Sequence, residues 1–421
     1  MNSTPQSERL HIGIFGKRNS GKSSLMNAIT GQTASLVSDV PGTTADPVRK
    51  AMEIPAIGPC LFIDTAGFDD DAEGLGKMRV NRTMKALEDT DIAILMFRDC
   101  DDTEKEWFKI LKDRKIPVIP VLNIFHEREK SLSDNNGSHK ESSQERLRDF
   151  NDHTGRTATI NEMTGEKPVE VNAETGENVQ AIFNSILRKL PENYGTHTIT
   201  GNLVKEGDTV MLVMPQDSQA PKGRLILPQV QTIRELLDRR CTVVNCTPDR
   251  IRETLQALSS PPQLIITDSQ AFSEAWSAKP EESRLTSFSI LFAGYKGDIS
   301  AFMDGTGALD RLTEDSRVLI AEACTHAPAT EDIGRVKIPR MLRQRIGQGL
   351  RIDIVSGTDF PEDLSGYDLI IHCGACMFNR RYVLNRIASA RSRHIPITNY
   401  GLTIAWAKGI LDKVAIPDQK Q

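Results

Sequence analysis

The chain has 421 residues, of which 38% are hydrophobic and 26% charged, the composition of a folded globular protein too long for one core. Its formal net charge of -5 disfavours a nucleic-acid partner, because neutralising phosphates needs a surplus of Lys and Arg on some face. No apolar run approaches the roughly 20 residues that span a bilayer, and the polar N-terminus lacks the apolar stretch of a signal peptide. We therefore expect a cytoplasmic protein that uses neither membrane nor nucleic acid.

Short apolar runs alternate with helical patterns over the first 190 residues, which predicts an α/β fold with a largely parallel sheet. Strands are expected at residues 11–15, 61–63, 92–97, 118–122 and 169–171, and a helix at about 178–190. Residues 127–167 are polar and charged, which predicts a solvated excursion that is either partly helical or partly disordered. A Pro- and Gly-containing linker at residues 191–201 marks a domain boundary.

Two further α/β units follow this linker. The first is expected to contain strands at 209–214, 241–245 and 264–267 with helices at 229–239 and 248–258. The second is expected to contain strands at 318–321, 351–355, 369–371 and 395–398. The predicted domains are therefore residues 1–193, 194–284 and 285–421.

A phosphate-binding loop is predicted between the first strand and the first helix, where GKRNSGKS fits G-x-x-x-x-G-K-[ST]. Its glycines let backbone amides face phosphates, and the helix N-terminus adds its positive dipole end. Lys22 is expected to reach the β- and γ-phosphates, and the Ser23 hydroxyl to bind Mg²⁺. A chance glycine-rich turn is the alternative, which the strand and helix context disfavours. The predicted nucleotide-binding residues here are Gly16, Asn19, Ser20, Gly21, Lys22, Ser23 and Ser24.

Two more segments suit a nucleotide hydrolase. Residues 64–67 (DTAG) follow a strand, which predicts Asp64 near the Mg²⁺ shell and the Gly67 amide near the γ-phosphate. Residues 41–44 (PGTT) lie where a switch loop brings a Thr hydroxyl, assigned to Thr44, to Mg²⁺. We assign catalysis to Lys22, Thr44 and Gly67.

These motifs resemble the translation-factor-related class of small P-loop GTPases, and the PGTT segment resembles the branch that includes the tRNA-modification GTPase. The resemblance implies that Asn19 helps to bind a potassium ion that replaces an arginine finger. Phe68 stands where Ras-like enzymes have the Gln that orients water, so slow intrinsic hydrolysis is expected.

The guanine-reading motif Asn-Lys-x-Asp of that class is altered in this chain. Asn123 is present, but Ile124 and His126 stand in place of the Lys and the Asp, and a neutral imidazole lacks a carboxylate's paired acceptors. Residues 171–176 resemble the last base-contacting loop, with Asn172 and Ala173 expected at the base. The sequence thus predicts binding of GTP without establishing strict guanine selectivity.

Four of the seven cysteines, at positions 60, 100, 241 and 246, are interpreted as packed thiols. The other three form a pattern with two histidines, because Cys324-x-His326 and His372-Cys373-x-x-Cys376 each follow a predicted strand. Carboxyl ends of parallel strands share one edge of a sheet, so both groups can converge. A structural zinc site, a redox pair and a chance cluster compete with an iron–sulfur cluster, which we favour. Three thiolates leave one iron for His326, His372, water or an incoming group.

The whole pattern resembles the HydF family of FeFe-hydrogenase maturation GTPases. The resemblance implies a GTPase domain, a dimerisation domain and a domain that holds a 4Fe–4S cluster on Cys324, Cys373 and Cys376. It also implies a homodimeric scaffold that receives parts from two radical-SAM maturases and delivers a two-iron subcluster to apo FeFe-hydrogenase. The alternative is a tRNA- or ribosome-associated GTPase with a structural zinc site, which the absence of a basic segment disfavours.

Overall fold

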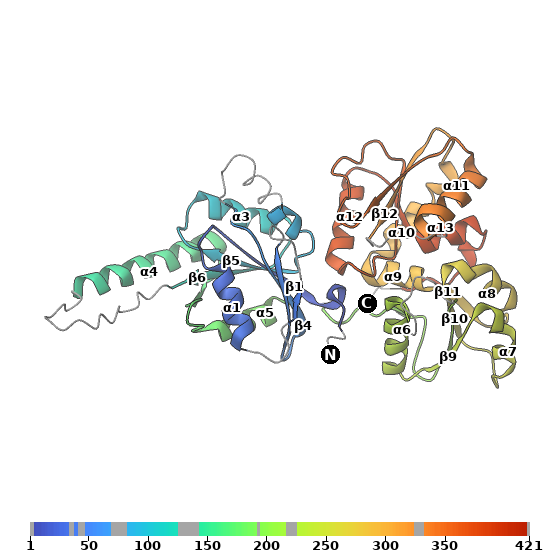
Figure 1. The fold of residues 1–421 in the computed structure, drawn as a ribbon, viewed down its shortest axis with the longest axis horizontal. Helices are drawn as coiled ribbons and strands as arrows, with labels where there is room; N and C mark the ends of the chain where they lie inside the picture. Colours follow the sequence, from blue (N-terminus) through green and yellow to red (C-terminus); the bar gives the residue numbers. More distant parts are fainter. Residues whose placement is uncertain are drawn as a thin grey trace. The chain divides into compact units, whose positions relative to one another are not determined.

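The computed structural model describes residues 4–32, 38–40, 47–68, 82–124, 143–191, 194–215, 225–323 and 332–418. The chain divides into two compact units, Met1–Glu192 and Asn193–Gln421 (Figure 1). Each unit combines helices with mostly parallel strands, which confirms the α/β fold class. Among the helices described, none has both the length and the hydropathy that crossing a bilayer requires. The predicted site residues Thr44, Cys324 and His326 lie outside the described residues.

The first unit is built on a seven-stranded sheet with the order β2-β3-β4-β1-β5-β6-β7. Its strands are Leu10–Gly16 (β1), Ser38–Val40 (β2), Val48–Ile54 (β3), Gly58–Asp64 (β4), Ile92–Phe97 (β5), Val118–Asn123 (β6) and Val169–Val171 (β7). All neighbours are parallel except that β3 runs antiparallel to β2 and β4. Every residue of β1, β5 and β6 is buried, as expected where helices cover both faces.

Strand β3 was not predicted from the sequence. Its residues VRKAMEI include three charges, so it lacks the continuous apolar run of the buried strands. Ladder pairing with β4 over its whole length, from Val48 opposite Asp64 to Ile54 opposite Gly58, holds it in the sheet. Such pairing joins segments through the backbone and leaves little trace in local composition.

The helices of the first unit are Lys22–Gln32 (α1), Asp102–Asp113 (α3), Ser143–Thr164 (α4) and Val179–Lys189 (α5). Helix α4 occupies much of the polar segment at 127–167 and extends away from the sheet (Figure 1). Its C-terminal half is held by Ile160, which is fully buried in the same apolar cluster as Trp107. The partly helical form of the predicted excursion is therefore the one observed for these residues.

The second unit contains two four-stranded parallel sheets, ordered β11-β10-β8-β9 and β13-β12-β14-β15. Their strands are Thr209–Val213 (β8), Thr242–Cys246 (β9), Leu264–Thr267 (β10), Arg284–Ser287 (β11), Arg317–Glu322 (β12), Arg351–Ser356 (β13), Leu369–His372 (β14) and Ile397–Asn399 (β15). The predicted boundary between residues 284 and 285 falls at the start of β11.

One apolar core serves both of these sheets, since a single cluster of buried residues includes Ile265 of β10 and Ile320 of β12. The helices are Leu227–Asp238 (α6), Ile251–Gln256 (α7), Phe272–Ala278 (α8), Phe288–Lys296 (α9), Ile299–Thr306 (α10), Ile338–Ile346 (α11), Arg380–Ser392 (α12) and Tyr400–Ala407 (α13). Helix α9 contacts α6 beside the first sheet and α12 and α13 beside the second. The Asn399 side chain also donates to the Ser289 carbonyl at 2.9 Å.

Candidate nucleotide and cysteine sites

The predicted phosphate-binding loop connects β1 to α1 and has the backbone that such a loop needs. Asn19 and Gly21 both adopt left-handed conformations, with φ of 58° and 96°. A Cβ at position 21 would also collide with the Asn123 side chain, so glycine is required there on two counts.

Lys22 is buried, and its ammonium group lies over this loop. Its Nζ donates to the carbonyl oxygens of Gly16 at 3.0 Å and Lys17 at 2.7 Å. Ser24, also predicted to bind nucleotide, lies exposed on the first turn of α1. The loop, the ammonium and the helix start are thus assembled around one point, as a phosphate site requires.

Two predicted magnesium-site residues meet at the carboxyl ends of β1 and β4. The Ser23 hydroxyl donates to Asp64 Oδ2 at 2.6 Å. Burial raises the pKa of Asp64, against the opposing effects of Ser23 and of the positive charges of Lys22 and Lys50. Asp64 Oδ1 is buried and has no hydrogen-bond partner among the described residues. A hydroxyl beside a carboxylate with one unused oxygen fits Mg²⁺, which prefers oxygen ligands.

The DTAG segment is anchored to β1 at its start and, through the following Phe68, to helix α3. The Thr65 hydroxyl donates to the Ile14 carbonyl at 2.7 Å, which fixes the end of β4 against β1. Phe68 is 6% exposed and stacks on Trp107 with ring centroids 4.7 Å apart. Phe68 therefore belongs to the core and supplies no group that could orient water.

Asn123 connects the phosphate loop to the second predicted base-contacting loop. Its Nδ2 donates to the Ser20 carbonyl at 3.2 Å, and its Oδ1 accepts from the Ala173 amide at 2.9 Å. Asn172 accepts from the Glu174 amide at 3.0 Å and so shapes that loop. The structure thus brings together Asn123 and Ala173, both predicted to lie near the base, and the Ala173 amide donates to the Asn123 side chain.

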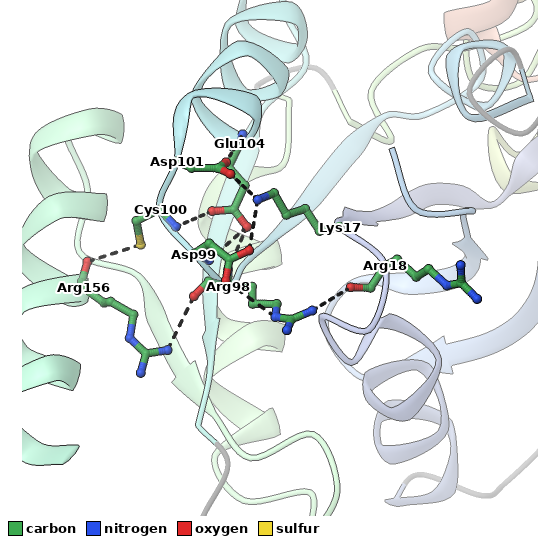
Figure 2. A network of polar contacts seen from close by, with 8 residues as sticks. All are labelled: Lys17, Arg18, Arg98, Asp99, Cys100, Asp101, Glu104 and Arg156. Carbon is green, nitrogen blue, oxygen red and sulfur yellow. Dashed lines mark hydrogen bonds and ion pairs between the residues drawn. The ribbon is translucent and has the colours of Figure 1, made fainter. Parts of the chain in front are cut away.

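A charged network behind the phosphate loop was missed by the sequence reasoning (Figure 2). Lys17 Nζ pairs with Asp99 at 3.0 Å and with Asp101. Although burial acts to lower it, the hydrogen bonds that the ammonium donates to Asp101 and Asp99 raise the pKa of Lys17 to about 12. Buried Glu104 accepts from the Arg98 amide at 2.8 Å. The available signal was the charged run RDCDD directly after β5, at the carboxyl edge of the sheet.

The second candidate site lies where β12 and β14 end side by side. Cys373 Sγ accepts hydrogen bonds from the backbone N–H groups of Ala323 at 3.0 Å and Ala375 at 3.4 Å. The Cys373 amide donates to the Ala321 carbonyl at 3.0 Å. Burial raises the pKa of the Cys373 thiol to about 11, while those two amides act to lower it.

Cys376 follows on a turn in which Ala375 has a left-handed conformation, with φ of 51°. The Cys376 side chain is half-buried and the neighbouring Met377 is 61% exposed. Within the part of the chain that the structure describes, no group of three or more His, Cys, Asp or Glu residues could hold a metal ion. The proposed third ligand, Cys324, lies outside that part.

His372, a predicted candidate for the open iron position, is buried and hydrogen-bonded within the protein. Its Nδ1 donates to the Cys373 carbonyl at 2.8 Å, and its Nε2 accepts from Arg386 Nη1 at 3.0 Å. Burial and the positive charge of Arg386 lower the pKa of His372 to about 3. Both ring nitrogens of this neutral imidazole therefore have protein partners in the structure.

The four cysteines interpreted as packed thiols are free and at least half-buried. Cys60 is the most enclosed, and burial raises its pKa to about 12. Cys241 donates to the Lys205 carbonyl at 3.4 Å. Their placement confirms the interpretation of these four residues as structural.

Three protein families match successive parts of this chain. Residues 11–124 match the family described as "50S ribosome-binding GTPase". Residues 199–297 match "Hydrogen maturase F dimerization domain", and residues 300–417 match "Hydrogen maturase F tetramerization domain". The first unit is therefore a P-loop GTPase domain. The second unit matches two domain families whose descriptions refer to dimerisation and tetramerisation.

Similar curated proteins match the GTPase part alone. GTPase Der of Wolinella succinogenes is 42% identical over 131 residues, which are 30% of this chain and 27% of Der. The tRNA modification GTPase MnmE of Chromobacterium violaceum is 30% identical over 183 residues, which are 44% of this chain and 35% of MnmE. The chain thus spans about a third or less of the length of these relatives.

Similar solved structures include Era in complex with MgGDPNP and nucleotides of 16S ribosomal RNA. The identity to Era is 19% and the TM-score is 0.32, over 59% of this chain and 97% of that one. The G domain of the T. maritima FeoB iron transporter has 18% identity and a TM-score of 0.30, over 44% of this chain and 99% of that one.

Proposed function

This chain belongs to the hydrogen maturase F family, and from that premise we propose that it is a GTP-hydrolysing scaffold for a metal cluster. It binds a 4Fe–4S cluster and delivers a two-iron subcluster to apo FeFe-hydrogenase. Two radical-SAM maturases supply the parts, and the scaffold works as a homodimer in the cytoplasm. The self-association names of the families matched at residues 199–297 and 300–417 support the oligomer.

Hydrolysis of GTP is proposed for the first unit. Lys22 binds the β- and γ-phosphates, and Ser23 with Asp64 holds Mg²⁺, as their 2.6 Å contact supports. Thr44 completes the magnesium site, the Gly67 amide contacts the γ-phosphate, and Asn19 contributes to a potassium site. Because Phe68 is packed in the core, hydrolysis without a partner or ion is slow.

The observation that carries the cluster proposal is the 3.0 Å hydrogen bond from the Ala323 amide to Cys373 Sγ. Ala323 is bonded directly to Cys324, and consecutive Cα atoms lie about 3.8 Å apart. The proposed ligand Cys324 is thus the residue that follows, in the sequence, the amide bound to Cys373 Sγ, which supports a shared site. Amide donors to sulfur are a feature of iron–sulfur sites, where they tune the cluster.

A buried cation beside these cysteines supports an anionic ligand. Arg386 is 3% exposed, and its Nη2 donates to the Gly357 carbonyl at 2.5 Å. Its guanidinium also lies 5.1 Å from the ring centroid of Phe378. The groups to which it donates among the described residues are neutral: His372, the Gly357 carbonyl and the Tyr382 hydroxyl. Buried charges normally have a countercharge. A cluster on three thiolates would be that countercharge.

When bound, such a cluster supplies one iron with an open position for an exchangeable group. Cys324, Cys373 and Cys376 would hold it, and His326 is the remaining histidine candidate for that position. Arg386 holds the His372 ring through the 3.0 Å hydrogen bond to Nε2.

Anaerobic reconstitution with iron and sulfide tests this function. We expect brown protein with broad visible absorption, and loss of iron and colour in Cys324→Ser, Cys373→Ser and Cys376→Ser. Cys246→Ser is the matched control, because Cys246 is a half-buried thiol outside the site. Colourless wild-type protein with stoichiometric zinc would reject the cluster and support a tRNA- or ribosome-associated GTPase.

A further inference from the structure

A pocket of about 300 Å³ lies beside the phosphate-binding loop. Its wall is formed by three segments: the loop at Asn19 and Ser20, the end of β5 as far as Asp99, and Asn123 at the end of β6. Arg156 of α4 completes the lining. The pocket adjoins the phosphate loop and Asn123, where the nucleoside end of a bound nucleotide is expected.

Two guanidinium groups are the distinctive feature of this pocket. Arg98 Nη1 donates to the Arg18 carbonyl of the phosphate loop at 3.2 Å, and Arg156 Nη1 donates to the Arg98 carbonyl at 3.5 Å. Figure 2 shows Arg98, which directly follows β5, and Arg156 of α4, linked by the hydrogen bond from Arg156 Nη1 to the Arg98 carbonyl. One arginine comes from the β5–α3 loop and the other from α4.

The segment that carries Arg98 is held in place before any ligand binds. Fully buried Glu104 accepts from the amides of Arg98 at 2.8 Å and Cys100 at 2.6 Å. The Asp99 carboxylate also lines the pocket, but it already faces two cations. Its Oδ2 accepts from Lys17 at 3.0 Å, and its Oδ1 lies 3.6 Å from Arg98 Nε.

We infer that Arg98 and Arg156 bind the base of the nucleotide through its O6 and N7 acceptors, so that this site selects 6-oxopurines as a class. The inference rests on the proposed binding of GTP and names the base chemistry of that same site. Guanine, hypoxanthine and xanthine all present this pair of acceptors and are all accepted.

The chemistry follows from which hydrogen-bonding groups line the pocket. A guanidinium has donors and no acceptor, and its paired N–H groups match O6 and N7 of guanine. Adenine carries an amino donor in place of O6 and is disfavoured. Reading the N1–H and 2-amino groups of guanine needs a paired acceptor, whereas His126 stands in place of the motif's Asp and Asp99 is engaged by Lys17. Asp99 is the one carboxylate among the lining residues that the structure describes, so we expect the 2-amino group not to be read there.

Equilibrium binding of GDP, IDP, XDP, ADP and 7-deaza-GDP to the full chain in Mg²⁺ tests this inference. We expect IDP and XDP to bind within about fivefold of GDP, while ADP and 7-deaza-GDP bind at least about tenfold more weakly. In Arg156→Ala the GDP-to-ADP ratio falls toward one. Arg188→Ala is the control, because Arg188 is exposed on α5 away from the pocket.

Ratios separate recognition from folding, because a misfolded phosphate site weakens every nucleotide alike and leaves the GDP-to-ADP ratio intact. An unchanged ratio in an Arg156→Ala variant that binds ADP as tightly as the wild type does would overturn this inference alone. Binding of IDP about 100-fold weaker than GDP by the wild type would also overturn it. If the wild type bound none of these nucleotides, the proposed GTPase function would fail as well.

Discussion

Arg386 donates a hydrogen bond from Nη1 to Nε2 of His372 at 3.0 Å, and both side chains are buried. This bond ties α12 to the end of β14, directly before Cys373. It requires a neutral imidazole with its proton on Nδ1, and that proton is donated to the Cys373 carbonyl. These two hydrogen bonds thus fix the position of the backbone at Cys373, where the C-x-x-C turn begins.

Replacing the arginine by Arg386→Leu should destabilise the second unit even without metal. The change leaves His372 Nε2 and the Gly357 carbonyl buried without their donor, at a cost of about 2–4 kcal/mol in the free energy of unfolding. Urea unfolding of the metal-free chain measures the effect. Arg393→Leu, an exposed arginine at the end of the same helix, should change stability by less than about 0.5 kcal/mol. Equal effects of the two substitutions would contradict this role for Arg386.

Removing the phosphate-loop lysine should separate the two proposed activities. In Lys22→Ala we expect GTP hydrolysis to fall by at least about 100-fold, because a positioned donor to the developing phosphate charge is lost. Iron content after reconstitution should stay unchanged, since the cysteines belong to the other compact unit. Phosphate release and iron assays on one preparation measure both. Concurrent loss of iron would count against independent sites.

The bridge made by Asn123 should matter for nucleotide affinity and for stability. Asn123→Ala removes bonds to the Ser20 carbonyl and the Ala173 amide, both buried, at a cost of about 1–3 kcal/mol. We expect GDP affinity to fall by about tenfold, because the phosphate-binding loop loses the hydrogen bond from Asn123 that holds its Ser20 carbonyl. Thermal unfolding and GDP titration provide the two readouts. Asn27→Ala, which removes an exposed contact with Lys50, should leave both nearly unchanged.

The buried pair of His11 and Asp89 should give the first unit a pH-dependent stability. Burial acts to lower the pKa of His11, but Asp89, Asp91 and the Gln6 carbonyl outweigh it and raise that pKa above 6.5. A raised pKa means that protonated His11 stabilises the fold fully below pH 6.5. This contribution disappears as the pH rises through the folded-state pKa. The lowered pKa of Asp89 keeps its carboxylate charged throughout this range.

Urea unfolding of the wild type and His11→Gln between pH 6 and pH 9 checks this dependence. The difference in unfolding free energy between the wild type and His11→Gln should shrink as the pH rises above 6.5. Replacing the partner, by Asp89→Asn, should also reduce the stability that protonated His11 contributes. Parallel pH profiles for the wild type and His11→Gln would refute the coupling.

Local sequence predicted much of the secondary structure correctly. The strand Ile92–Phe97 was predicted to the residue, because a continuous apolar run between turn signals reports burial on both faces. Val169–Val171 was also predicted to the residue, although Glu170 interrupts its apolar run and only Val171 is buried. The phosphate loop was also predictable, since its spacing and its glycine at position 21 encode a backbone conformation directly. Strand β3 was missed because its ladder with β4 depends on a partner rather than on its own charged residues.

The sequence by itself determined the α/β class, the phosphate loop and the cysteine pattern, because each depends on the order and type of nearby residues. Only the tertiary structure decided that His372 faces Arg386 and that Arg98 and Arg156 share a pocket with Asn123. Those contacts join residues from 14 to 58 positions apart. The physical reason is that a side chain's partners depend on which strands and helices pack together, and residue spacing along the chain does not specify that packing.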